Sequence, residues 1–119
     1  MASTAPQQAP RTRAEELRAL MDEDQATTVV DVRQPASYNS SPLTILGAVR
    51  IPPDEIAQRY REIPPDQPVV TFCTGPHETT SARVARFLLE HGYRHVSALQ
   101  GGFNTWEALG YPTEEKSGA

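Results

Sequence analysis

Short apolar runs alternate with amphipathic helical segments along the whole chain, and this alternation is the strongest constraint on the fold. Apolar residues recur at helical spacing in residues 13–23, 54–63, 79–91 and 103–109. Compact runs of apolar and β-branched residues occupy 27–32, 47–51, 68–72 and 95–99. Because strands and helices that alternate over short distances build parallel sheets, we predict an α/β domain with a mostly parallel sheet.

The 119 residues suffice for one domain and are too few for two ordinary ones. Residues 1–10 carry Ala, Gln, Ser, Thr and Pro without periodicity, so we predict a disordered N-terminal segment there. Residues 113–119 have the composition of a second frayed end. The predicted domain therefore spans residues 11–112.

Charge and composition argue against several classes of function. Eleven Lys and Arg against fifteen Asp and Glu give a net charge of −4, which disfavours nucleic-acid binding and docking on an anionic membrane. No stretch approaches the ~20 apolar residues of a membrane span, and residues 1–13 lack the apolar core of a secretory signal. The single cysteine excludes an internal disulfide and a cysteine-rich zinc site. We expect a cytoplasmic monomer.

The single cysteine, Cys73, directly follows residues 68–72, which form the clearest strand of the chain. In parallel sheets ligands bind beyond the carboxyl ends of the strands, so Cys73 lies where such a sheet places a site. Cysteine attacks as the thiolate, and inward-pointing loop N–H groups and the positive end of the next helix favour that anion. The alternative is that Cys73 is a small apolar residue that ends a strand.

The loop after Cys73 is suited to tight curvature and leads into a helix that begins near residue 79 or 80. Gly75 is free to take a positive φ, and Pro76 is rigid. Three consecutive hydroxyl residues are candidates for the helix N-cap, namely Thr79, Thr80 and Ser81. We therefore predict a cradle of backbone amides around the Cys73 sulfur.

Several short motifs together resemble those of the single-domain rhodaneses over residues 27–112. They are Asp31-Val32-Arg33, Gly47-Ala48 with Ile51-Pro52, Cys73, Ser81-Ala82 with Ala85, Gly101-Gly102-Phe103 with Trp106, and Gly110-Tyr111-Pro112. Each motif is weak alone, but their order and spacing are specific. The resemblance implies a three-layer α/β domain with helices on both faces of the sheet, and a sulfurtransferase activity.

In such an enzyme a thiolate at the Cys73 position attacks the outer sulfur of thiosulfate or of a persulfide donor. The persulfide that forms is bound by loop amides and passes to an acceptor, which is cyanide or a thiol. The resemblance implies no metal and no organic cofactor. Because the chain has no second cysteine, release of the sulfur requires an external partner, either a small thiol or a protein.

The resemblance also implies a set of site residues around the catalytic Cys73. The loop residues that would bind the anionic substrate are Thr74, Gly75, Pro76, His77, Glu78, Thr79 and Thr80. The supporting residues are Asp31, Arg33 and Ser81. For Asp31 we expect a mainly structural role, in which its carboxylate binds backbone amides or Arg33.

This chain departs from the rhodanese pattern in the loop itself. The common loop has five residues, usually with Gly and Arg, between the cysteine and a Ser or Thr that opens the helix. Counted back from Gly92, the loop here is about two residues longer, or the helix is longer and opens at Thr79. No arginine lies between Cys73 and the helix, and Glu78 adds a negative charge.

A carboxylate that faces the pocket would oppose both thiolate formation and thiosulfate binding. We favour the alternative that Glu78 pairs with a base, which would be Arg33, Arg83 or another. His77 would assist thiolate formation if its ring reached Cys73, and would otherwise be solvated.

Two other functions remain open at the level of the sequence. One is a sulfur-carrier or protein-binding domain whose Cys73 does not turn over. The other is a phosphatase or arsenate reductase of the same fold. Those enzymes need an arginine six positions after the cysteine, where this chain has Thr79, and this disfavours them.

Overall fold

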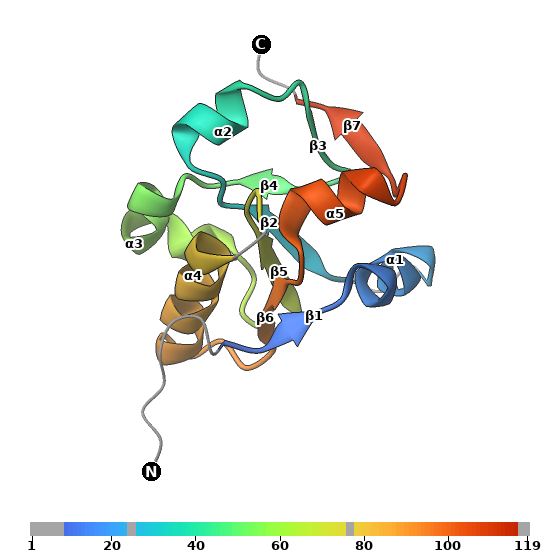
Figure 1. Ribbon diagram of the computed structural model, residues 1–119. Helices are drawn as coiled ribbons and strands as arrows, with labels where there is room; N and C mark the ends of the chain where they lie inside the picture. Colours follow the sequence, from blue (N-terminus) through green and yellow to red (C-terminus); the bar gives the residue numbers. More distant parts are fainter. Residues whose placement is uncertain (1–8, 24–25, 76–77, 117–119) are drawn as a thin grey trace.

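Five strands form one parallel sheet in the order β1-β6-β5-β2-β4 (Figure 1). Along the chain these strands are β1 (Arg11–Thr12), β2 (Thr28–Asp31), β4 (Val49–Arg50), β5 (Val69–Phe72) and β6 (Val96–Leu99). The computed structural model describes residues 9–23, 26–75 and 78–116. The central position of β5 places its carboxyl end, and with it Cys73, in the middle of one edge of the sheet.

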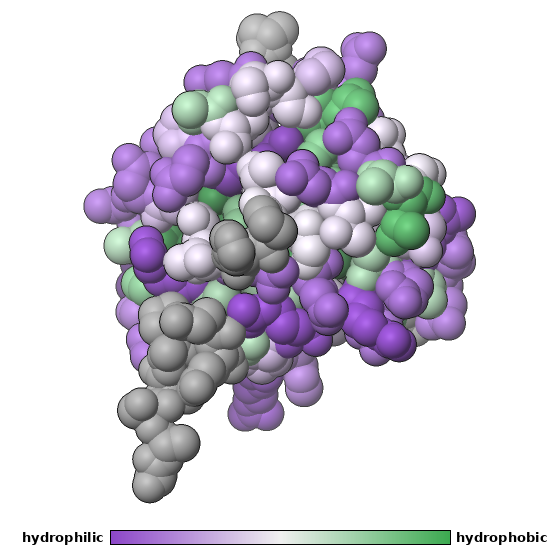
Figure 2. Space-filling model, viewed as in Figure 1, coloured by the Kyte–Doolittle hydropathy of each residue, from purple (hydrophilic) through white to green (hydrophobic). Residues whose placement is uncertain are grey.

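Helices cover both faces of this sheet (Figure 1). They are α1 (Ala14–Asp22), α2 (Pro35–Asn39), α3 (Ile56–Arg59), α4 (Thr79–Glu90) and α5 (Gly102–Ala108). In the described part of the chain, no helix is long and apolar enough to cross a bilayer. On the face seen in Figure 2, hydrophilic residues predominate and apolar residues form small, separate patches.

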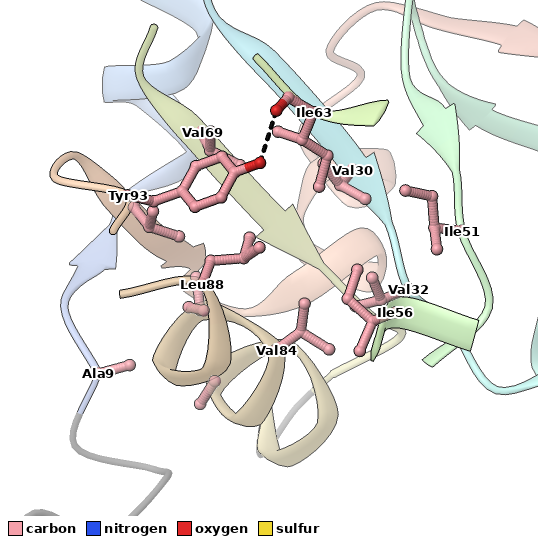
Figure 3. Close-up of a cluster of buried hydrophobic side chains, with 14 residues drawn as sticks. Ala9, Val30, Val32, Ile51, Ile56, Ile63, Val69, Val84, Leu88 and Tyr93 are labelled. Carbon is pink, nitrogen blue, oxygen red and sulfur yellow. Dashed lines mark hydrogen bonds between the residues drawn. The ribbon is translucent and has the colours of Figure 1, made fainter. Parts of the chain in front are cut away.

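Two apolar cores lie on opposite sides of the sheet because side chains alternate along a strand. Val30 and Val69 pack with Val84 and Leu88 in the core under α3 and α4 (Figure 3). The adjacent residue on each strand, Val29 before Val30 and Val70 after Val69, belongs to the other core. There it is joined by Leu17 of α1 and by Phe103 and Trp106 of α5. The predicted three-layer α/β architecture is confirmed.

Residues 54–63, predicted as one helix, are broken into three short pieces. A 3₁₀ turn over Pro53–Glu55 precedes α3, and a second over Tyr60–Glu62 follows it. The segment ends with Ile63 in an extended conformation, because a residue before proline is disfavoured in the α region. The strand predicted over 47–51 is present only as Val49–Arg50.

The prediction that residues 113–119 are disordered is wrong for its described part. Thr113–Glu115 form β7, which pairs in antiparallel register with β3 (Leu43–Ile45). The ladder continues at Lys116, whose N–H donates to the Pro42 carbonyl over 3.0 Å. These mostly polar residues give no apolar pattern, and backbone hydrogen bonds order them instead.

The N-terminal boundary also lies earlier than predicted. Ala9 is buried, and the Pro10 carbonyl accepts a hydrogen bond from the Ala98 N–H at 2.9 Å. The ordered domain therefore includes at least residues 9 and 10. The remainder of the two predicted tails, residues 1–8 and 117–119, lies outside the described residues.

Candidate active site

Cys73 lies at the first position after β5 and is only 7% exposed. It borders a hollow of about 260 Å³, here called the Cys73 hollow. Its described lining residues are Gln34, Ser37, Cys73, Thr74, Gly75, Glu78, Thr79 and Thr80. The structure thus brings five of the seven predicted loop residues together around one space. The other two, Pro76 and His77, lie outside the described residues.

Gln34 and Ser37 line the same hollow and were missed by reasoning from the sequence. Both follow the carboxyl end of β2, which pairs with β5 in parallel register through Asp31 and Phe72. Because the carboxyl ends of parallel strands share one edge, the chain after β2 and the chain after β5 approach each other there. The position of Gln34 just after Asp31-Val32-Arg33 was the available signal.

Ser81 connects the cysteine to the start of α4. The Cys73 Sγ donates to the Ser81 Oγ over 3.4 Å, and that hydroxyl in turn donates to the Glu78 carbonyl over 3.2 Å. Thr71 fixes the same turn of the helix, since its hydroxyl donates to the Ser81 carbonyl over 2.8 Å. A serine hydroxyl both accepts and donates hydrogen bonds. Ser81 can therefore accept from a thiol and donate to a sulfur anion at the same position.

The helix begins at Thr79, so of the two alignments left open by the sequence the structure has the longer helix. The N-cap residue is Glu78, and the expectation that Thr79, Thr80 or Ser81 provides the cap is wrong. The reason is the backbone at Glu78, which takes φ 58 and turns the loop sharply into the helix. Thr79 and Thr80 line the Cys73 hollow, so the positive end of this twelve-residue helix lies beside it.

The Glu78 carboxylate is paired on both oxygens. Its Oε1 accepts from the Arg11 Nε over 2.8 Å, and its Oε2 accepts from the Gly101 N–H over 2.9 Å. The preference for a paired carboxylate is therefore confirmed, but the partner is neither of the two arginines named in advance. Arg33 is bound to Asp31, and Arg83 is exposed on α4.

The loop after Cys73 packs backbone to backbone against the start of α5. The Phe103 N–H donates to the Cys73 carbonyl over 2.8 Å. A Cβ on Gly75, which has φ 91, would lie 2.5 Å from the Gly101 carbonyl oxygen. A Cβ on Gly102 would lie 2.6 Å from the Cys73 carbonyl oxygen. Only glycines permit this approach, so Gly101-Gly102 supports the active-site loop as well as turning the chain.

Asp31 and Arg33 form a buried ion pair next to the site rather than in it. Each is 1% exposed, and the Arg33 Nη2 lies 2.7 Å from the Asp31 Oδ2. The Asp31 carboxylate also accepts from the Arg33 backbone N–H and from the Thr44 hydroxyl. The Arg33 guanidinium stacks 4.6 Å from the centre of the Phe103 ring. The pair therefore ties β2 to β3 and to α5, whose first turn holds the Cys73 carbonyl.

The described residues show no cluster of three or more His, Cys, Asp or Glu side chains that could bind a metal ion. The geometry provides a thiol at the carboxyl end of the central strand, a serine hydroxyl 3.4 Å from its sulfur, and a helix N-terminus beside it. This arrangement defines a class of α/β domains that place a cysteine at the carboxyl end of the central strand.

Comparison with known proteins identifies the family within that class. Residues 13–109 match the sequence pattern of the rhodanese-like domain. The chain is 33% identical over 84 residues to thiosulfate sulfurtransferase GlpE of Tolumonas auensis, an overlap of 71% of this chain and 74% of that protein. It therefore belongs to the rhodanese-like domain family.

Two further similarities show how widely the domain is used. The chain is 35% identical over 104 residues to the HTH-type transcriptional regulator Rv0324 of Mycobacterium tuberculosis, an overlap of 87% of this chain but 44% of that protein. The solution structure of the rhodanese-like domain of Alr3790 from Anabaena sp. superposes with a TM-score of 0.75 at 26% identity. That superposition covers 92% of this chain and 86% of the Anabaena chain.

Proposed function

We propose that this protein is a sulfurtransferase that moves a sulfane sulfur from thiosulfate or a persulfide donor to a thiol or to cyanide. The observation that carries this proposal is the position of Cys73. Its sulfur borders a hollow at the carboxyl end of the central strand, 3.4 Å from a hydroxyl and beside the start of α4. The thiosulfate sulfurtransferase named above, as a relative of this chain, supports the same activity.

The reaction takes place in two displacements at sulfur. The Cys73 thiolate attacks the outer sulfur of thiosulfate, a bond forms between the two sulfurs, and sulfite leaves with the electron pair of the broken S–S bond. The enzyme then carries a persulfide anion on Cys73. A cyanide or thiolate acceptor attacks the terminal sulfur of that persulfide, and the Cys73 thiolate is released unchanged. No metal or organic cofactor takes part.

The loop residues from Thr74 to Thr80 bind the donor and then the persulfide, according to this proposal. In this proposal, backbone N–H groups of the loop form the cradle expected from the sequence, and the positive end of α4 adds to it. The Ser81 hydroxyl donates to the sulfur anion once Cys73 has lost its proton. Such fixed dipoles stabilise developing charge without having to reorganise during the reaction.

A second candidate function is a domain that carries or senses sulfur on Cys73 without turnover. It is favoured by the absence of arginine between Cys73 and α4, and by the relative that is named as a transcriptional regulator. In this function the persulfide forms in the same way, but transfer needs a specific protein acceptor.

Intact-mass spectrometry tests the shared first step. After incubation with thiosulfate and removal of the excess, the wild-type chain should gain the mass of one sulfur atom, and Cys73→Ser should gain none. Added cyanide should then return the mass to its starting value and release thiocyanate. Continuous thiocyanate formation identifies the enzyme, whereas a persulfide that forms on Cys73 but is not transferred to cyanide identifies the carrier. No sulfur on the wild-type chain from thiosulfate or from a persulfide donor would contradict both functions.

A further inference from the structure

The Cys73 hollow has an unusual electrostatic composition for a site that takes an anionic substrate. Of its described lining residues, Glu78 alone carries an ordinary side-chain charge, and that charge is negative. The Glu78 side chain is 13% exposed, so its carboxylate is largely screened from solvent. An unpaired carboxylate in this position would repel both the Cys73 thiolate and a thiosulfate dianion.

Arg11 provides the opposite charge from a distant part of the chain. Its guanidinium Nε lies 2.8 Å from the Glu78 Oε1, and its side chain is 23% exposed. Arg11 does not line the Cys73 hollow, so it acts on the site through Glu78. The two residues are 67 positions apart in the sequence.

The fold holds Arg11 in this position through the edge strand β1. Arg11 pairs with Ala98 of β6 in parallel register, and the Thr12 carbonyl accepts from the Gln100 N–H over 2.8 Å. The next residue along is Gly101, whose N–H binds the other oxygen of the Glu78 carboxylate. Strand β1 and the turn after β6 therefore each donate a hydrogen bond to the Glu78 carboxylate.

We propose that Arg11 is a charge-compensating positioning residue for the Cys73 reaction. It neutralises Glu78 and fixes the carboxylate on the Gly101 amide, and it thereby makes the hollow compatible with an anionic sulfur donor. The arginine missing from the loop is replaced, in its electrostatic effect, by one on the N-terminal strand. This inference deepens the proposed function and rests on it for the identity of the donor.

Two alkylating agents that differ in charge test the proposal without any sulfur transfer. Iodoacetamide is neutral and iodoacetate is anionic, and the same Cys73 thiolate attacks the iodine-bearing carbon of either reagent and displaces iodide. The ratio of their rate constants therefore reports the local charge and not the fraction of thiolate. Because this ratio is independent of turnover, failure of the present inference can be told apart from failure of the proposed function.

Arg11→Met should lower the iodoacetate-to-iodoacetamide ratio by about threefold or more, since it leaves the Glu78 charge unpaired. It should also raise the KM for thiosulfate by a similar factor and change kcat less. Adding Glu78→Gln to Arg11→Met should return the ratio to the wild-type value, whereas Glu78→Gln alone should raise the ratio above that value, because it leaves the Arg11 charge unpaired. Arg11→Lys, which keeps the charge, should have an iodoacetate-to-iodoacetamide ratio close to that of the wild type. Arg94→Met removes the same charge from an exposed residue in the turn before β6 and is the matched control, with no change expected.

An unchanged ratio in a folded Arg11→Met chain would overturn the proposal. So would a double variant that is as impaired as Arg11→Met, because that result would mean that Arg11 matters only for the strand. Should Arg11→Met fail to fold, Arg11→Gln keeps a hydrogen-bond donor and removes the charge. It carries the same expectation, and a wild-type ratio in Arg11→Gln would equally refute the inference.

Discussion

Replacing Ser81 by Ala removes the hydroxyl that contacts the Cys73 sulfur and leaves almost everything else in place. Ser81 is fully buried, and its Oγ lies 3.4 Å from the Cys73 Sγ. The Glu78 carbonyl, which accepts from the same hydroxyl, keeps its hydrogen bond from the Ala82 N–H at 2.9 Å. The substitution therefore tests one interaction of the sulfur with little change to the start of α4.

The expected loss is larger for reactivity than for stability. A hydrogen bond to a charged group contributes about 1.5–3 kcal/mol, against about 1 kcal/mol for one between neutral groups. If the Ser81 hydroxyl donates to the sulfur anion in the transition state, its removal should slow persulfide formation by about 10- to 100-fold. The free energy of unfolding should fall by only about 1 kcal/mol, because the thiol form loses a weak neutral bond.

The assay is a single-turnover measurement of persulfide formation from thiosulfate, with urea unfolding of the same samples. Ser40→Ala is the control, because the exposed Ser40 hydroxyl donates to the Ser37 backbone carbonyl and not to the Cys73 sulfur. A Ser81→Ala rate within about twofold of wild type would refute the role of this hydroxyl. A slower rate accompanied by a large loss of stability would also refute it, because the effect would then be structural.

Three further predictions concern the frame around the site. Gly102→Ala, at φ 62, would place a Cβ within 2.7 Å of three backbone atoms of the active-site loop. It should cost about 2–4 kcal/mol by urea unfolding, and a milder loss would show that the loop can move away. Arg33→Met removes the nearer charge partner of the buried Asp31 carboxylate, leaves only Arg50 at 3.7 Å, and should cost about 3 kcal/mol. In contrast, Arg18→Met breaks an exposed pair and should cost less than about 0.5 kcal/mol, and equal costs would refute the assignment. Burial raises the pKa of Tyr93, so its contribution to stability is complete below the ordinary tyrosine pKa near ~10 and is lost as the pH rises through the folded value. Tyr93→Phe should reduce this alkaline loss in a pH series of thermal melts, and an unchanged series would contradict the cause.

The elements of the central sheet were predictable wherever burial leaves a local pattern in the sequence. Residues 68–72 read as a strand because β5 is buried along its whole length, and the structure has it at Val69–Phe72. The position of Cys73 at a carboxyl edge followed from that assignment alone. Residues 27–32 and 95–99 were recognised as strands for the same reason.

Elements that are ordered by distant backbone contacts left no such pattern. Strand β1 has two residues, and β7 is mostly polar, so neither shows an apolar period. Their order comes from hydrogen bonds to β6 and β3, which lie far away in the sequence. A frayed end was therefore the natural reading of residues 113–119, although the structure contradicts it up to residue 116.

The same limit applies to the site. A carboxylate in the loop indicated that a basic residue had to neutralise it. No pattern in the neighbouring sequence indicated Arg11, which lies 67 positions away in β1. The supporting role of Gly101-Gly102 depends on a backbone approach so close that a Cβ on Gly75 would lie 2.5 Å from the Gly101 carbonyl oxygen, and only the assembled fold displays it. The sequence was enough to predict that Glu78 is paired with a basic residue, but not which basic residue.

The central claim is that Cys73 accepts the outer sulfur of the donor, and isotopic labelling tests it most directly. Thiosulfate labelled in the outer sulfur should leave its label on the peptide that contains Cys73, whereas thiosulfate labelled in the inner sulfur should release its label as sulfite. Subsequent cyanide should recover the outer label as thiocyanate. Label on Cys73 from the inner sulfur, or thiocyanate formed equally well by Cys73→Ser, would contradict the account.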